Sequence, residues 1–506
     1  MRLMPGRMRE VELVEVVDER APARQAPDQP VAAEPPDDVR AARTWVRRHA
    51  PWLVASAALV VGSLVVTQVV LDRREDARVA ALAAVPGVVP PVDASIGVLW
   101  RADPELATAL RSGAVVDGVL VGGVQDESGA SAVVGLDPDT GVVAWRTPLD
   151  LPTPQPTPTS AWPEQWISCT PVARGTAHVV ACVSQQVGEG VEGIPPSSVW
   201  VLDPAHGDVL ADSEVPGGWG LSFVDDGMVV ARPVSGDRWE VRATDVVDGT
   251  PRWSWTTPRL ERTDDEAPSA MASLQSSEDH VVLVVDTRSW VLTTAGHLEL
   301  DVPLDSASWL QPARAGVFIE STWTSSAFSG TLLLPDGSRV PIDETANWLA
   351  VDDGSAPDVV FTVGQAPGGA DGLSGRSART GERLWHVAGT IVTSLLLDGT
   401  LYVATSRSLV AVDAATGRLH WTTETDHIPQ QLSTDGRHLL LPGPGVTLEA
   451  YTLSDGALAW TADLADEVRA EVAGDRRTVF VQGFQSGWHD PRLYVWTDTG
   501  AVAVLG

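Results

Sequence analysis

A short motif recurs from about residue 97 to the end of the chain, and it restricts the possible folds more than any other feature. Its clearest copy is AVDAATGRLHW at residues 411–421, where a strand-like run meets a Thr-Gly turn and a tryptophan follows the glycine four positions later. Copies that keep the turn but lack the tryptophan occur at Gly207, Gly296, Gly337 and Gly500. The full copies pair Gly141 with Trp145, Gly249 with Trp253, Gly381 with Trp385, Gly417 with Trp421, and Gly456 with Trp460.

The spacing of these turns matches one repeat architecture. Most neighbouring turn glycines lie 36 to 47 residues apart, which is the length of one four-stranded propeller blade. The Asp or Ser before each glycine caps the turn, and the glycine supplies a positive φ. We expect the tryptophan to cover the gap between adjacent blades, because a large flat side chain buries much apolar area there.

We therefore predict an all-β fold, a β-propeller of about eight four-stranded blades, with seven and nine as alternatives. The 45 Gly and 37 Pro, against only 6 Phe and 3 Tyr, indicate many turns. The segment GVLWRAD at residues 97–103 resembles an outer strand without a turn of its own. Because a single blade is too thin to be stable, this strand is expected to close the ring with the C-terminal end.

Residues 51–71 form an uncharged and mostly apolar run of the length that a helix needs to cross a bilayer. We expect an uncleaved anchor, since a signal peptide would not have so long a leading segment. The arginine balance slightly favours a cytoplasmic N-terminus. The predicted parts are a disordered cytoplasmic tail at 1–50, a single transmembrane helix at 51–71, a juxtamembrane linker at 72–96 and a propeller at 97–506.

The two cysteines bear on the compartment. Cys169 and Cys182 flank a segment that looks like a turn between two strands. A disulfide across neighbouring antiparallel strands would place the propeller outside the cytoplasm, while two unpaired buried thiols are the alternative. We predict a single-pass protein of the cell membrane with the propeller outside.

The charge excludes one class of partner. Residues 1–50 and 72–78 are balanced, so the whole formal charge of −32 belongs to residues 79–506. A domain this acidic repels nucleic acid and anionic lipid at long range. Within the tail, the Val/Glu alternation at residues 10–17 could add as a strand to a partner's sheet, although an unstructured tail is the alternative.

No catalytic, cofactor-binding or metal-binding residue is predicted. The sequence lacks G-x-S-x-G and H-E-x-x-H, and a phosphate loop needs a lysine, which the chain does not contain. Asp137 and Asp139 are interpreted as turn caps rather than calcium ligands. A Pro/Thr-rich loop at residues 149–166 is expected to form part of a binding surface, with Trp162 and Trp166 as aromatic anchors.

The D-A-x-T-G-x-x-x-W blades resemble the pyrroloquinoline-quinone-like propeller repeat superfamily, also called quinoprotein alcohol dehydrogenase-like. Some of its members are dehydrogenases, and others, similar to the bacterial outer-membrane assembly propeller, bind no cofactor and bind proteins instead. The enzymes would be expected to have two adjacent cysteines over the quinone and an Asn, a Glu and an Asp around calcium. Here Cys169 and Cys182 are not adjacent, and Asn347 is the only asparagine.

The resemblance therefore implies the non-enzymatic, membrane-anchored branch. We expect a binding or scaffold module of the bacterial cell envelope, with no cofactor and with a protein or cell-surface ligand as partner. Two alternatives remain. One is a membrane-bound oxidoreductase that uses pyrroloquinoline quinone, and the other is a transmembrane sensor that contacts a cytoplasmic partner through residues 9–19.

Overall fold

The computed structural model describes most of the chain, in two compact units, Met1–Arg74 and Glu75–Gly506. The described residues are 37–126, 128–151, 165–186, 195–260, 272–277, 279–305, 308–323, 328–365, 371–465, 481–487, 490–497 and 502–506. The segment at residues 9–19, considered above as a contact for a cytoplasmic partner, lies outside them.

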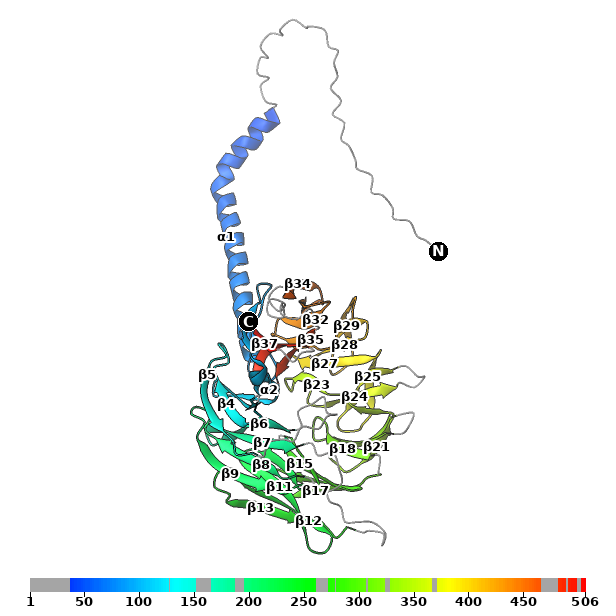
Figure 1. Ribbon diagram of the computed structural model, residues 1–506. Coiled ribbons are helices and arrows are strands. Elements are labelled where there is room, and N and C mark those ends of the chain that lie inside the picture. The colour runs from blue at the N-terminus through cyan, green and yellow to red at the C-terminus, as the bar shows by residue number, and fades with distance from the viewer. Residues whose placement is uncertain are drawn as a thin grey trace, which may run out of the picture. The chain divides into compact units, whose positions relative to one another are not determined.

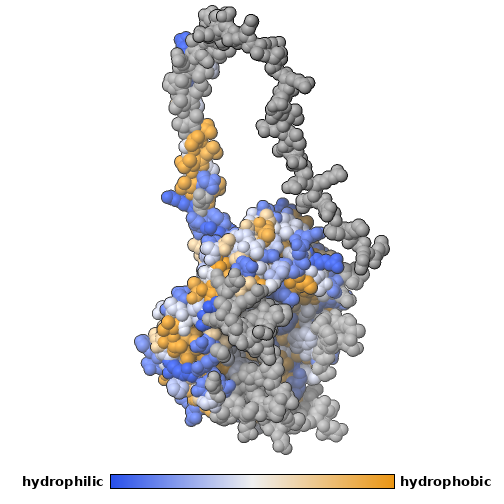
Figure 2. All heavy atoms as spheres, turned by 45° about the horizontal axis from the view of Figure 1, so that its top comes forward, coloured by the Kyte–Doolittle hydropathy of each residue, from blue (hydrophilic) through white to orange (hydrophobic). Residues whose placement is uncertain are grey.

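One long helix, α1 (Asp37–Leu82), covers the region in which a tail, a transmembrane segment and a linker were predicted. It extends beyond 51–71 on both sides because the flanks are rich in Ala and Arg, which are good helix formers. Its large apolar side chains between Leu59 and Leu71 are exposed, and Figure 2 shows them as a hydrophobic band. The structure supports the helix but not the predicted span: over the described residues, no helix has the length and apolarity needed to cross a membrane.

The second unit is a β-propeller, and its described strands form nine sheets (Figure 1). Strands of blades one to four are numbered from the innermost to the outermost. Blade one is β2 (Ala114–Val116), β3 (Val119–Gln125), β4 (Ser131–Leu136) and β5 (Val143–Pro148). Blade two is β6 (Gln165–Arg174), β7 (Ala177–Gln186), β8 (Ser197–Leu202) and β9 (Val209–Val215). Blade three is β10 (Gly220–Val224), β11 (Gly227–Val234), β12 (Arg238–Asp245) and β13 (Pro251–Thr256). Blade four is β14 (Ser273–Ser276), β15 (His280–Val285), β16 (Arg288–Thr293) and β17 (Leu298–Pro303).

Blades five to eight follow in the same order. Blade five is β18 (Ser308–Pro312), β19 (Phe318–Trp323), β20 (Phe328–Leu333) and β21 (Arg339–Ile342). Blade six is β22 (Glu344–Ala346), β24 (Val359–Gln365), β25 (Asp371–Ser377) and β26 (Arg383–Ala388). Blade seven is β27 (Ile391–Leu397), β28 (Thr400–Thr405), β29 (Ser408–Asp413) and β30 (Leu419–Glu424), with β23 (Leu349–Asp352) added at its inner edge. Blade eight is β31 (Ser433–Thr434), β32 (His438–Gly443), β33 (Thr447–Thr452) and β34 (Leu458–Asp463).

Blade nine closes the ring with strands from both ends of the second unit. Its strands are β35 (Val481–Gly487), β36 (Asp490–Thr497), β37 (Val502–Leu505) and, outermost, β1 (Val98–Ala102). Closure by the segment at 97–103 is therefore confirmed, and β1 runs antiparallel to β37. The helix α2 (Pro104–Ser112) then leads from β1 into blade one.

The closing blade also explains why the predicted number of eight blades is one too low. Eight of the nine repeated turns join the third and fourth strands of blades one to eight. Gly500 instead lies between β36 and β37, the second and third strands of blade nine. Blade nine has no turn between its third and fourth strands, because its fourth strand comes from the other end of the unit, so counting such turns misses one blade.

The core consists of apolar clusters between neighbouring blades. Leu120 and Leu136 of blade one, for example, pack with Tyr494 and Val504 of blade nine. Clusters of this kind join every pair of adjacent blades around the ring. Middle strands bury both of their faces, which is why β4 is buried along its whole length.

Apart from the added strand β23, neighbouring strands in each blade run antiparallel, so their connections alternate between two faces of the ring. The connections from the first to the second strand and from the third to the fourth strand lie at the same face, which we call the turn face. Both the eight glycine turns of blades one to eight and the Asp398–Gly399 turn between β27 and β28 belong to it.

Candidate functional site

The end of α1 belongs to the propeller unit and lies on its turn face. Glu75 and Arg78 are one helical turn apart, a spacing that brings their side chains together. Val79 and Leu82, on the side of the helix that faces the propeller, are 4% and 5% exposed. This short stretch thus has charged side chains and buried apolar side chains at the blades.

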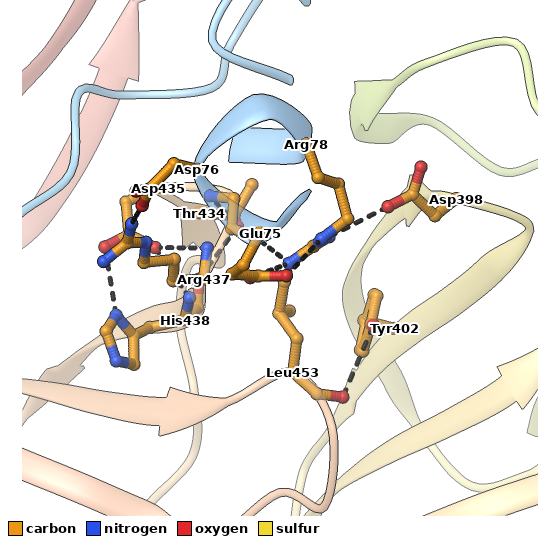
Figure 3. A network of polar contacts seen from close by, with 11 residues as sticks. Glu75, Asp76, Arg78, Asp398, Tyr402, Thr434, Asp435, Arg437, His438 and Leu453 are labelled. Carbon is orange, nitrogen blue, oxygen red and sulfur yellow. Dashed lines mark hydrogen bonds and ion pairs between the residues drawn. The ribbon is translucent and has the colours of Figure 1, made fainter. Parts of the chain in front are cut away.

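Arg78 binds both blades seven and eight, as Figure 3 shows. Its guanidinium donates two hydrogen bonds to the Glu75 carboxylate, at 3.0 and 2.7 Å. A third, of 2.8 Å, goes to Asp398 in the β27–β28 turn, and a fourth, of 2.9 Å, goes to the carbonyl of Gly436 in the β31–β32 turn. We call these four residues the Arg78 clamp.

The electrostatics of the clamp favour the charged forms. The hydrogen bond from Arg78 holds the pKa of Glu75 below its usual value, and the bonds to Glu75 and Asp398 raise the pKa of Arg78. A second ion pair lies beside the clamp, and in it the helix supplies the acid and the blade supplies the arginine. Arg437 of blade eight donates to Asp76 of the helix at 2.6 Å. Two charge-assisted contacts therefore join the helix end to blade eight.

The chain after α1 continues along the inner edge of blade eight. Val88 bridges Thr434 in parallel orientation, and the N–H of Val89 donates to the Thr434 carbonyl at 2.9 Å. The buried Asp435 accepts hydrogen bonds from the N–H of Val92 and from His438. Burial of Asp435 opposes its ionisation, but the bonds from His438 and from neighbouring backbone N–H groups outweigh it and lower its pKa.

Apolar side chains also join the end of α1 and the residues after it to blades seven and eight, and we call this whole contact region the junction. Leu82 and Val88 belong to the cluster between blades seven and eight, together with Tyr402 and Leu453. Burial raises the pKa of Tyr402 to about 12, and its hydroxyl lies 3.4 Å from the Leu453 carbonyl. The end of α1 is therefore a structural part of two blades rather than a tether attached to their surface.

Blades six and seven share a strand crossover that departs from the repeat. After β22 the chain leaves blade six and forms β23, which pairs in parallel with β27 of blade seven. Asn347 lies at the crossing: its N–H donates to the Phe361 carbonyl of blade six at 3.1 Å, and its side-chain amide donates to Ser394 of blade seven at 2.7 Å. The only asparagine of the chain thus fixes the crossover on both sides.

A cavity of about 350 Å³ opens beside this crossover. We call it the crossover pocket. Trp348, at its edge, is 60% exposed, and Val392 is 37% exposed. The lining residues carry no formal charge, and they are Ala346, Asn347, Trp348, Leu349, Ala350, Val363, Ile391, Val392 and Thr393.

A second cavity, of about 400 Å³, lies between the outer parts of blades seven and eight and is acidic. The Tyr451 hydroxyl donates to Glu449 at 2.7 Å, and burial together with this carboxylate raises the pKa of Tyr451. The other acidic lining residues are Glu424, Asp426 and Asp455, and His427 lies among them. The negative charge of these carboxylates favours binding of a basic side chain. The described residues contain no group of three or more side chains placed to hold a metal ion.

The motif tryptophans lie against the turn of the next blade. Trp421 donates from Nε1 to the Leu453 carbonyl at 2.9 Å, and its ring covers Gly456, where an added Cβ would lie 2.4 Å from the ring. The same contact joins Trp145 to Gly207, Trp253 to Gly296, Trp385 to Gly417 and, from the closing strand, Trp100 to Gly141.

Where a blade lacks the motif tryptophan, no ring of the described residues covers the turn glycine of the next blade. Ala211 stands where blade two would have the tryptophan, and the next turn glycine, Gly249, has no atom within 4 Å of an added Cβ. Trp460 is half-buried and packs edge-on against His438, and the turn of the next blade at Gly500 lies outside the described residues.

Blade five also lacks the tryptophan, and blade six, which follows it, contains a buried ion pair. Glu344, 2% exposed, accepts hydrogen bonds from Arg376, Thr362 and Ser374. Burial of Glu344 opposes its ionisation, but the bond from Arg376 and the two hydroxyl bonds lower its pKa. These bonds join three strands of blade six, β22, β24 and β25, through one buried carboxylate.

The remaining predicted residues lie apart from these sites. Cys169 and Cys182 face each other on β6 and β7 and form a disulfide. Trp166 lies in β6 opposite Gln185 rather than in a loop, whereas Trp162 lies outside the described residues. The Arg78 clamp and the crossover pocket were not predicted, and the single Asn347 was the only sequence signal near either.

Comparison with known proteins agrees with this architecture. The family model of outer membrane protein assembly factor BamB matches residues 370–481, from blade six to the start of blade nine. None of the curated protein sequences matches the chain significantly.

Solved structures are similar to the chain at low identity. BamB from Moraxella catarrhalis is 13% identical, with a TM-score of 0.38, over 81% of this chain and 98% of that chain. A europium-containing methanol dehydrogenase is also 13% identical, with a TM-score of 0.33, over 70% and 75%. Similarity this low says nothing about activity. By the matched segment and the repeated blades, the chain is similar to the pyrroloquinoline-quinone-like β-propeller superfamily.

Proposed function

We propose that this protein is a binding or scaffold module of the cell envelope, anchored in the membrane by α1 and without catalysis. The observation that carries the proposal is the match of residues 370–481 to an outer membrane protein assembly factor. The matched blades are those that hold the end of α1 and part of the crossover pocket. They combine a firm attachment of the chain with an open apolar pocket, as a protein-binding module requires.

Support for the anchor comes from the sequence and from the exposure of α1. Residues 51–71 are uncharged. Leu59, Leu64 and Val66 are 73%, 63% and 64% exposed. A helix with so many exposed aliphatic side chains gains free energy by burying them in lipid or in another protein.

Support for a location outside the cytoplasm comes from the disulfide between Cys169 and Cys182. Disulfides persist in oxidising compartments and are rare in the cytoplasm. The arginines before residue 51 agree with a cytoplasmic N-terminus.

The anchor is tested by extracting membranes that contain the full chain with alkaline carbonate. We expect the chain to remain in the membrane fraction, and the double variant Leu64→Arg, Val66→Arg to be released into the supernatant. A matched control, Val209→Arg with Leu210→Arg, places two arginines at an exposed edge of the propeller instead. Release of the wild-type chain by carbonate would contradict the anchor.

The absence of catalysis is tested by titrating the full chain in detergent micelles with pyrroloquinoline quinone and calcium. We expect no saturable change in quinone absorbance and no rise in melting temperature, relative to calcium alone. A saturable spectrum with a raised melting temperature would instead establish the quinoprotein alternative.

A further inference from the structure

We propose that the crossover pocket binds a bulky apolar side chain, presented by an uncharged segment of a partner protein. The inference rests on the proposed binding role and gives it a place on the propeller. The pocket adjoins the first residues of β27, while Asp398 of the Arg78 clamp follows the last residue of the same strand. Pocket and helix end therefore lie at opposite ends of one strand.

The exposure of Trp348 is the first reason. Of the propeller tryptophans whose side chains the structure describes, Trp348 is the most exposed, at 60%, whereas the motif tryptophans are buried or half-buried against the next blade. Val392 adds a second exposed apolar side chain to the same pocket. Tryptophan at the edge of a cavity is the residue type that most often dominates the energy of a protein interface.

The size of the pocket is the second reason. A volume of about 350 Å³ lies at the lower end of the range for binding pockets and has room for one large side chain with neighbouring backbone. Seven of the nine lining residues are apolar. The Asn347 amide and the Thr393 hydroxyl remain as polar groups that can orient a peptide backbone.

The charge of the pocket is the third reason, because it differs from that of the domain. The propeller carries a large negative charge, yet no lining residue is charged. A charged side chain that entered would lose its water without gaining an ion pair, which costs free energy. The acidic domain also repels an acidic segment at long range. An uncharged apolar segment meets neither penalty.

The crossover is held in place before any partner arrives. Asn347 is bonded to Phe361 on one side and to Ser394 on the other, and Leu349 is in register with Ser394. A pocket fixed in this way loses little conformational entropy on binding. The exposed indole of Trp348 can therefore be changed with little effect on the fold.

The test selects peptides of random sequence, displayed on phage, against the full chain in detergent micelles. We expect the selected peptides to share a Leu, Ile, Phe or Trp within an uncharged segment. Their binding should weaken at least tenfold with Trp348→Ala and with Val392→Asp, and less with Trp348→Phe. Leu458→Ala, an exposed apolar residue on the outer strand of blade eight, serves as the matched control and should not weaken binding.

Each other result would overturn the inference. Selected peptides with a charged consensus, or peptides whose binding is unchanged by Trp348→Ala, would place recognition elsewhere. Quenching of the indole fluorescence by maltose or N-acetylglucosamine that saturates and is lost in Trp348→Ala, without any selected peptide, would assign the pocket to a small ligand. The quinone titration and the carbonate extraction test the proposed scaffold function independently of the peptide selection, so the two proposals can fail separately.

Discussion

Arg78 and Asp398 are 320 positions apart in the sequence, and a hydrogen bond of 2.8 Å joins their side chains. The same guanidinium donates to the carbonyl of Gly436 in the next blade. Because Arg78 belongs to α1, the end of the helix connects two blades that are otherwise joined by their apolar interface. The helix end therefore contributes to the stability of the ring at this point.

Replacing Arg78 by Gln should lower the melting temperature of the full chain in detergent micelles. Hydrogen bonds to charged groups contribute about 1.5–3 kcal/mol when shielded from water. The Arg78 side chain is 34% exposed, so solvent screening reduces the expected loss to about 1 kcal/mol. Asp398→Asn should lower the melting temperature in the same direction and by a smaller amount.

The control for this variant is Arg73→Gln, five residues earlier on the same helix. Arg73 is exposed, so its replacement should leave the melting temperature unchanged. An equal decrease for Arg73→Gln and Arg78→Gln would show that loss of any arginine in α1 has this effect, and that the clamp has no part in it.

Asp435 predicts how stability changes with pH. Its pKa is lower in the folded chain than its ordinary value of 3.8, so its contribution to stability is present above about pH 4. That contribution is lost as the pH falls through the lowered pKa, because protonation removes the acceptor for His438 and Val92.

Asp435→Asn should therefore lower the melting temperature at pH 7 and have a much smaller effect at pH 3. Melts of both chains across this range measure the difference. Asp212→Asn is the control, because Asp212 is exposed on the outer strand of blade two, away from blades seven and eight. A difference between wild type and Asp435→Asn that stays constant from pH 7 to pH 3 would contradict the assignment.

The repeat could be predicted from the sequence because its parts are local. A turn glycine and the tryptophan four positions later belong to one hairpin, so their spacing is visible without knowledge of the ring. The closing strand around Trp100 was likewise recognisable as an outer strand without a turn. Which glycine each tryptophan covers depends on the order of blades, and that follows only once the ring is closed.

The junction and the crossover could not be predicted, because their contacts join residues far apart without any repeated spacing. In the sequence, Arg78 is one of several arginines that follow an apolar run, and no pattern connects it to Asp398. At the crossover, β22 and β23 have three and four residues, too few for an alternating pattern to appear. Asn347 stands out in the sequence as the single asparagine, but its hydrogen bonds to two blades could not be predicted from that.

The disulfide between Cys169 and Cys182 predicts the thiol content of the native protein. The full chain, isolated without reductant, should have no thiol that reacts with iodoacetamide under denaturing conditions, and should have two after reduction. Both cysteines are buried, and the double variant Cys169→Ala, Cys182→Ala should lose about 2–4 kcal/mol of stability. Two reactive thiols before reduction would contradict a propeller outside the cytoplasm.

The buried pair of Glu344 and Arg376 predicts a non-additive double mutant. Glu344→Leu alone should cost about 3–5 kcal/mol, because it leaves the Arg376 charge buried without its partner. The double variant Glu344→Leu, Arg376→Met should cost less than Glu344→Leu alone, since neither charge then remains. Urea unfolding of the four chains measures the coupling. A double variant less stable than either single one would show that the pair contributes little beyond packing.

The contact between each motif tryptophan and the next turn glycine can be isolated by comparing Gly456 with Gly249. Both glycines have positive φ, at 70° and 69°, so replacing either by Ala has the same backbone cost of about 1–2 kcal/mol. At Gly456 the new Cβ would also meet the ring of Trp421 at 2.4 Å, whereas at Gly249 it meets nothing within 4 Å. Gly456→Ala should therefore be more destabilising by a further 1–3 kcal/mol or so, the usual range for overpacking.

Unfolding by urea distinguishes the two contributions. In a Trp421→Ala background the ring is gone and Thr423 Oγ1, 2.6 Å from the added Cβ, is the close neighbour that remains, so the excess cost of Gly456→Ala over Gly249→Ala should shrink. Equal losses for the two glycine variants in the wild-type background would mean that the ring yields without cost. In that case the tryptophans would stabilise the blades through their Nε1 hydrogen bonds and buried area, and the close fit to the glycine would have no separate effect.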